Sequence, residues 1–230
     1  MNILLLHGAL GTKHQLGFLA DCLDHTNCRS ITFTGHGDSE VPLEGLSMEV
    51  FLRDIDHALE KVDGPVHLVG YSLGGYAALA WAAEHPGRVG SVVTIGTKLI
   101  WTPDALAEEL KKLDPAMIAE KVPVFAEGLA AVHGEERWKG LVSATAKLIT
   151  GLTDSPVLTD EAFARVTAPV MLIVGDQDDM AGPEDTLATA RKLKDAGTVV
   201  LPFTRHPFEE IDLDLLVNLL TRFWDGLVAE

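Results

Sequence analysis

The sequence contains little cysteine and little positive charge. Cys22 and Cys28 are its 2 cysteines, too few for a disulfide framework and without the Cys-x-x-Cys spacing of a metal site, which favours a reducing, cytoplasmic location. Lys and Arg number 18 against 34 Asp and Glu, and the net charge of −16 opposes binding to nucleic acid and to anionic membrane surfaces. Neither kind of partner is therefore expected.

A long apolar run is also missing. The longest, residues 76–83, is far shorter than the about 20 residues that a membrane-spanning helix needs. No basic stretch precedes the short apolar run at 3–6, so a signal peptide is not expected. With 230 residues, 47% of them hydrophobic, the chain can bury one large core, and one compact domain is expected.

Short runs rich in Val, Ile and Leu alternate with segments of helical periodicity. Because most of these runs are apolar on both faces, they are typical of strands in a buried parallel sheet. Strands are predicted at 2–6, 30–34, 66–69, 91–95, 170–174 and 198–202. Helices are predicted at 15–24, 47–62, 73–85, 183–196 and 209–228, with Ser47 as an N-cap and Gly197 as a helix stop. The alternation predicts a doubly wound α/β fold: a six-stranded, mostly parallel sheet flanked by helices.

The segment 98–159 interrupts this alternation. Stretches at 103–114, 115–128 and 135–151 carry apolar residues at helical spacing and are separated by Pro or Gly. An unstructured loop of this length would be improbable in a compact domain. We therefore expect a helical cap at residues 98–159, inserted into a core formed by residues 1–97 and 160–230.

A candidate nucleophile follows the predicted strand at 66–69. The strand runs into Gly70-Tyr71-Ser72-Leu73-Gly74 and then into an Ala-rich helix, which is the pattern of a serine on a sharp turn between strand and helix. Small residues two positions before and after Ser72 prevent a collision between strand and helix. The hydroxyl is expected at the carboxyl edge of the sheet, beside the positive end of a helix. The alternative is a tight glycine turn with an incidental serine.

With these residues the sequence resembles the α/β-hydrolase family along essentially its whole length, as a small capped member that lacks the first two strands. The segment His7-Gly8-Ala9-Leu10-Gly11 resembles the family's oxyanion loop. The resemblance implies that the amides of Ala9 and Leu73 form an oxyanion hole and that His7 braces the loop. The missing hairpin would expose a sheet edge, which a helix or a second copy of the chain could cover.

The resemblance also implies an acid and a base, in the chain order serine, acid, histidine. A neutral serine needs a histidine to take its proton, and a carboxylate must orient that histidine. After the strand at 170–174 the family's spacing selects Asp178, with Asp176 and Asp179 left as alternatives. Of the 9 histidines, His206 alone follows the last predicted strand and is the expected base. His133 is among those expected to be surface or packing residues.

These residues together predict a serine hydrolase that cleaves a small carboxylic ester or thioester through an acyl-enzyme, without a cofactor or metal. Four cap residues are expected to line the acyl pocket or else to pack the cap on the core: Trp101, Met117, Phe125 and Trp138. One alternative is a triad-dependent C–C bond hydrolase, or a lyase or synthase of the menaquinone-pathway type. The synthases carry an arginine four residues after the serine, where this sequence has Tyr76. The other alternative is a non-catalytic protein that binds a small ligand.

Overall fold

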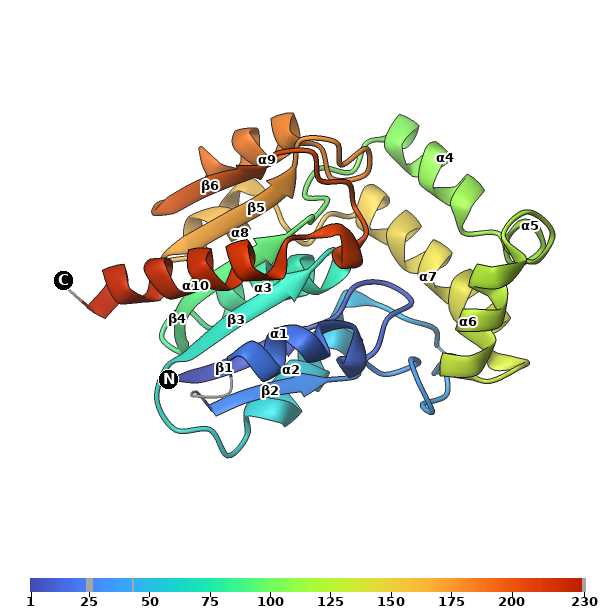
Figure 1. Ribbon diagram of the computed structural model, residues 1–230, viewed down its shortest axis with the longest axis horizontal. Coiled ribbons are helices and arrows are strands. Elements are labelled where there is room, and N and C mark those ends of the chain that lie inside the picture. The colour runs from blue at the N-terminus through green and yellow to red at the C-terminus, as the bar shows by residue number, and fades with distance from the viewer. Residues whose placement is uncertain (24–26, 43, 229–230) are drawn as a thin grey trace.

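The computed structural model describes residues 1–23, 27–42 and 44–228 (Figure 1). A central sheet has the strand order β2-β1-β3-β4-β5-β6, and all its pairings are parallel. The strands are β1 (Asn2–Leu6), β2 (Asn27–Ile31), β3 (Val66–Tyr71), β4 (Val89–Ile95), β5 (Val170–Gly175) and β6 (Ala196–Leu201). The predicted doubly wound α/β fold with six strands is confirmed.

Helices cover both faces of the sheet. One face carries η1 (Lys13–Leu16), α1 (Gly17–Cys22), η2 (Phe208–Glu210) and α10 (Leu213–Val228). The other carries α2 (Met48–Leu59), α3 (Leu73–Glu84), α8 (Asp160–Arg165) and α9 (Pro183–Ala190). Along β1, Ile3 and Leu5 pack against the first group and Leu4 and Leu6 against the second. This two-sided burial explains why the strand runs lack polar alternation.

Four further helices lie together beyond the carboxyl ends of the strands, at the right of Figure 1. They are α4 (Pro103–Lys112), α5 (Pro115–Lys121), α6 (Pro123–His133) and α7 (Arg137–Asp154), and we call them the helical cap. The predicted helix 115–128 is two helices, because Val122 leaves helical geometry at φ −135° and ψ 59° before Pro123. A residue before proline is driven out of the helical region, so Pro123 ends one helix and begins the next.

The predicted bounds of one strand and one helix are wrong. β2 spans Asn27–Ile31 and not 30–34, because the amides of Phe33 and Thr34 donate to the side chains of His7 and Asp54, at 3.0 and 2.7 Å, instead of joining the sheet. The helix predicted at 183–196 ends at Ala190, and Gly197 lies inside β6, paired with Met171.

Other helix predictions agree with the structure more closely. Ser47 occupies the N-cap position of α2, although its side chain accepts no capping hydrogen bond from the described residues. The helix predicted at 15–24 is found as η1 and α1, although its last residue, Asp24, lies outside the described residues.

Within the described ranges, no helix is long and apolar enough to cross a membrane. The same residues contain no group of three or more His, Cys, Asp or Glu that could hold a metal ion. Cys22 and Cys28 are both free cysteines.

Candidate active site

Ser72 lies at the tip of a strained turn between β3 and α3. Its backbone has φ 51° and ψ −121°, a conformation that a residue with a side chain adopts only when the surrounding structure enforces it. Here the enforcement comes from the end of β4 and the loop after it: the Ser72 amide donates to the Ile95 carbonyl at 2.8 Å, and the Thr97 hydroxyl donates to the Ser72 carbonyl at 3.0 Å. The turn therefore holds the hydroxyl at the carboxyl edge of the sheet.

Three glycines allow the close approach that this turn needs. A Cβ on Gly70 would collide with the backbone of Gly74, and a Cβ on Gly74 would collide with the Leu6 carbonyl. A Cβ on Gly8, in the loop after β1, would lie 3.1 Å from Ser72 Cβ. The loop that resembles an oxyanion loop therefore touches the serine turn.

Asp178 and His206 form a hydrogen-bonded pair in the loops after β5 and β6. His206 Nδ1 donates to Asp178 Oδ2 at 2.9 Å, while Asp178 Oδ1 accepts from the amides of Met180 and Ala181 at 3.0 and 2.8 Å. Burial favours the neutral acid, but the bonds from His206 and the two amides outweigh it and hold the pKa of Asp178 below its usual value. Since Nδ1 keeps its proton and donates it in a hydrogen bond to the carboxylate, Nε2 of the neutral ring is the basic nitrogen.

Gly96 connects this pair to the serine. Its neighbours Ile95 and Thr97 bind the Ser72 backbone, and a Cβ on Gly96 would lie 3.1 Å from Asp178 Oδ2 and 3.5 Å from His206 Nδ1. In the described part of the chain, neither the Ser72 hydroxyl nor His206 Nε2 has a hydrogen-bond partner. Hydrogen bonds between a nucleophile and its base are often loose in structures without substrate.

The structure separates the three aspartates after β5. Asp178 is 4% exposed and faces His206, whereas Asp179 is exposed. Asp176 is also exposed, and its carboxylate accepts from the Thr204 amide at 3.2 Å. Among these candidates, Asp178 is therefore the one positioned to orient a histidine.

Two amides beside Ser72 are suited to a developing negative charge. Leu73 opens α3, where amides have no partner within the helix. In the residues that the structure describes, the Ala9 amide also donates to no acceptor. Both residues line the same cavity as Ser72.

The cavity at Ser72 is small, about 40 Å³. Its wall consists of Ala9, Ser72, Leu73, Tyr76, Lys98, Trp101, Glu109, Ile149 and Met180. Trp101 lies there as expected. Its Nε1 is buried and has no partner among the described residues, so an acceptor on a bound molecule could satisfy it. The Lys98 ammonium is held by the Met180 carbonyl at 3.0 Å, and Glu109 lies 3.6 Å from Lys112.

Sequence reasoning did not find Lys98, Glu109 or Met180. Lys98 lies 3 residues after the end of β4, and Met180 lies 5 residues after the end of β5. Position at a strand end was therefore a usable signal for these two residues. Glu109 lies within a charged stretch of α4 and gives no such signal.

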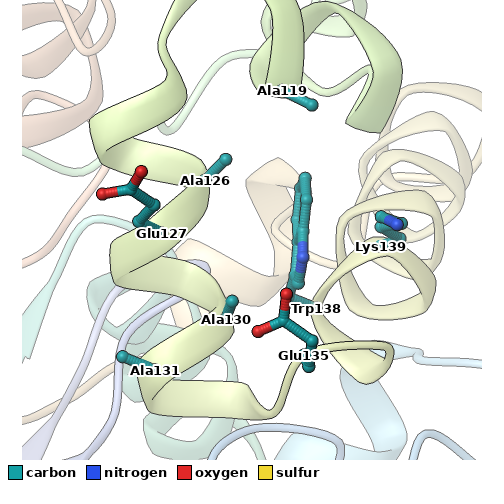
Figure 2. Close-up of a pocket in the computed structure, with 8 residues that line it drawn as sticks. All are labelled: Ala119, Ala126, Glu127, Ala130, Ala131, Glu135, Trp138 and Lys139. Carbon is teal, nitrogen blue, oxygen red and sulfur yellow. The ribbon is translucent and has the colours of Figure 1, made fainter.

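The other three predicted pocket residues lie elsewhere in the cap. Met117 and Phe125, 43% and 47% exposed, border a groove between α5 and α6. Figure 2 shows Trp138 beside Ala126 and Ala130 of α6, in a separate hollow of about 370 Å³. The residues that line the cavity at Ser72 do not include these three; Trp138 is buried within the cap, whereas Met117 and Phe125 are partly exposed to solvent.

Comparison with known proteins finds a matching family. The family described as Alpha/beta hydrolase family matches residues 3–212. A 2-(acetamidomethylene)succinate hydrolase of Mesorhizobium japonicum is 29% identical over 214 residues, which cover 84% of this chain and 76% of that protein. A putative 2-succinyl-6-hydroxy-2,4-cyclohexadiene-1-carboxylate synthase of Bacillus subtilis is 27% identical over 202 residues, covering 77% and 73%.

Solved structures show the same fold. NosK from Streptomyces actuosus superposes with a TM-score of 0.83 at 22% identity, and the alignment covers 98% of each chain. At this identity the likeness concerns the arrangement of the chain in space and not the chemistry at its edge.

Proposed function

The chain belongs to the α/β-hydrolase family, and from this premise we propose that it is a serine hydrolase that cleaves a small carboxylic ester or thioester. Ser72 is the nucleophile, His206 the general base and Asp178 the residue that orients His206. The amides of Ala9 and Leu73 form the oxyanion hole. The substrate is a small molecule, and no step requires a cofactor.

In this reaction His206 carries the proton from Ser72 to the leaving group. His206 Nε2 removes the hydroxyl proton of Ser72 as the oxygen bonds to the substrate carbonyl carbon, and the carbonyl oxygen becomes negative. The two amides stabilise that oxygen, and Asp178 stabilises the imidazolium. The imidazolium then returns its proton to the departing alcohol or thiol. A water deprotonated by His206 releases the acyl group as a carboxylic acid and frees Ser72.

One observation carries the proposal: the hydrogen bond between His206 Nδ1 and Asp178 Oδ2, 2.9 Å long, lies against Gly96, whose neighbours hold the Ser72 backbone. His7, which lies in the loop after β1, uses both ring nitrogens, with Phe33 and Gly8. His206 instead keeps Nε2 without a partner in the described chain.

The cavity supports a small acyl group. Its volume of about 40 Å³ is enough for a few non-hydrogen atoms beside the serine, and Tyr76 and Ile149 close its wall.

Tyr76 also bears on the synthase alternative. Its hydroxyl accepts from the Leu158 amide at 3.1 Å, so it is used in packing and supplies no cation where the synthases carry arginine.

A labelling and turnover experiment tests the proposal. A fluorophosphonate probe should label the wild type and leave Ser72→Ala unlabelled, and nitrophenyl esters and acyl thioesters should be hydrolysed with an optimum at short acyl chains. Labelling at Ser72 without turnover of any ester would favour C–C cleavage, the synthase reaction or ligand binding. A folded wild type that takes no label would refute the nucleophile.

A further inference from the structure

Three buried histidines connect three separate segments beside the candidate oxyanion loop. His7 follows β1, His36 lies in the loop after β2, and His133 is the last residue of α6 in the helical cap. Each is 1% exposed. The ring centroids of His7 and His36 are 4.9 Å apart, and those of His36 and His133 are 6.0 Å apart. The proposed reaction uses none of these rings.

His133 hydrogen-bonds to two backbone segments at once. The Gly37 amide donates to His133 Nδ1 at 2.8 Å, so Nδ1 must carry a lone pair. The proton therefore resides on Nε2, which donates to the Leu10 carbonyl at 2.8 Å. The two bonds determine one neutral tautomer and join the cap to the loop that contains Ala9.

Leu10 is a residue that needs such support. Its φ is 60°, in the left-handed region that a leucine adopts at a cost of about 1 kcal/mol or more. Other bonds hold the beginning of the loop: Gly8 donates to Gln15 Oε1 at 2.9 Å, and its carbonyl accepts from His7 and from the Gly11 amide. Within residues 1–23, 27–42 and 44–228, the bond from His133 is the one that reaches Leu10, immediately after the Ala9 amide.

We propose that His133 is a positioning residue through which the docked cap holds the oxyanion loop in its active shape. This inference rests on the function proposed above. When the end of α6 lies in place, its imidazole holds Leu10 in the left-handed conformation and keeps the Ala9 amide directed at the cavity. When α6 moves away, Leu10 relaxes and the oxyanion hole loses one donor. Cap closure and assembly of the hole are then one event.

The groups around His133 favour this neutral, bridging state. Burial, and then the nearby positive charge of Arg137 on α7, lower the pKa of His133 against the opposing bond to Leu10. Arg137 itself lies 3.5 Å from Asp38 and 3.8 Å from Glu40. The remaining ring neighbour is His36, which burial also keeps neutral. A proton on Nδ1 would face the Gly37 amide and break the bridge.

Two substitutions separate positioning from packing. His133→Gln offers one acceptor and one donor at similar spacing, whereas His133→Leu fills the site without either bond. With a short nitrophenyl ester, we expect H133L to lower kcat about tenfold or more with KM changed less than about twofold, because the loss of an oxyanion donor acts on the transition state. H133Q should retain most of kcat. H133L with kcat within twofold of the wild type would overturn the proposal.

Leu10 provides an independent readout. In a Leu10→Gly chain the left-handed conformation costs nothing, so adding H133L should lower kcat less than it does in the wild type. Equal losses in both backgrounds would contradict the proposed route through Leu10. If H133L does not fold, His133→Asn replaces it: its shorter amide cannot bridge both backbone segments, and kcat equal to that of H133Q would also overturn the proposal.

The fluorophosphonate probe distinguishes a failure of this inference from a failure of the proposed function. Its phosphoryl oxygen occupies the oxyanion hole, so H133L should label more slowly at Ser72, and His57→Gln, an exposed histidine on α2, should label at the wild-type rate. If Ser72→Ala still takes the label, the proposed nucleophile is wrong. If Ser72 labels as proposed but H133L labels and turns over as the wild type does, the role of His133 alone is wrong.

Discussion

The hydroxyl of Tyr71, the residue before the serine, donates a 3.0 Å hydrogen bond to the carbonyl of His206. The ring centroids of Tyr71 and His206 are 5.5 Å apart. Burial raises the pKa of Tyr71 above its usual value, so the phenol stays protonated and remains a donor. Tyr71, the last residue of β3, therefore holds the loop that carries His206. Because Tyr71 directly precedes Ser72, this bond connects the serine turn to the histidine loop.

Tyr71→Phe tests that connection. Loss of the hydroxyl leaves a part-buried carbonyl without its donor, which should lower the free energy of unfolding by about 1–3 kcal/mol. We also expect kcat to fall while the fluorophosphonate still labels Ser72, because the base is less well placed and the nucleophile is intact. Urea denaturation and ester hydrolysis measure the two effects. An unchanged kcat would show that His206 needs no help from Tyr71.

Ser72 should be strained as well as reactive. Both Ser72→Ala and Ser72→Gly should be inactive, but alanine keeps a Cβ at φ 51° and glycine does not. Relief of this strain, reduced by the greater flexibility of unfolded glycine, should make S72G more stable than S72A by about 1 kcal/mol. Thermal unfolding of the pair measures the difference. Equal stability, or a less stable S72G, would mean that the turn stores no strain.

Asp178→Asn should reduce kcat by a factor on the order of 10⁴, because the amide no longer enforces the tautomer with a free Nε2. Asp179→Asn, at the exposed neighbouring carboxylate, is the matched control and should leave kcat nearly unchanged. A large loss in D179N with a small one in D178N would transfer the orienting role to Asp179.

Asp178 should also make the free energy of unfolding depend on pH in the acid range. Its folded-state pKa lies below the usual value, so its ionised form stabilises the folded chain above about pH 4, and that contribution disappears as the pH falls through the folded pKa. The stability difference between the wild type and D178N should therefore shrink below about pH 4. Urea unfolding at several pH values tests this, and a constant difference would contradict it.

His36 should make the fold sensitive to mild acid. Burial lowers the pKa of His36 to about 4, against about 6.5 when unfolded, so the unfolded chain binds the extra proton between these values. Stability contributed by the neutral ring is complete above about pH 6.5 and is lost as the pH falls toward 4. His36→Phe should reduce the slope of unfolding free energy against pH by up to about 1.4 kcal/mol per unit in this window. An unchanged slope would show that His36 is not the titrating group.

The sequence was most informative where one physical requirement acts over a short stretch. Strands buried on two faces must be apolar throughout, and a serine on a tight turn needs Gly70 and Gly74, so both features were predictable. The resemblance to the α/β-hydrolase family then selected His206 and Asp178, with Asp176 and Asp179 as alternatives to Asp178. The Asp178–His206 hydrogen bond agrees with that prediction, and their catalytic roles stay predictions until they are tested.

What could not be predicted depends on contacts between distant segments. β2 ends early because Phe33 and Thr34 donate to side chains on other elements. In the cap, apolar spacing marks which face of a helix is buried but not what it faces, so Trp138 could not be assigned to one cavity or another. His133 reaches Leu10 across 123 positions of sequence, and a lone histidine near a helix end carries no local sign of that partner.

Helix α3, which supports Ser72, is buried from Leu73 to Ala83 and packs on the sheet, α2 and α8. A substitution there disturbs the core, whereas much of α4 to α6 faces solvent. Proteins with this fold can therefore change their substrate preference through substitutions in the cap helices while α3 stays unchanged. Sequence differences among such proteins should concentrate in the segment between β4 and β5.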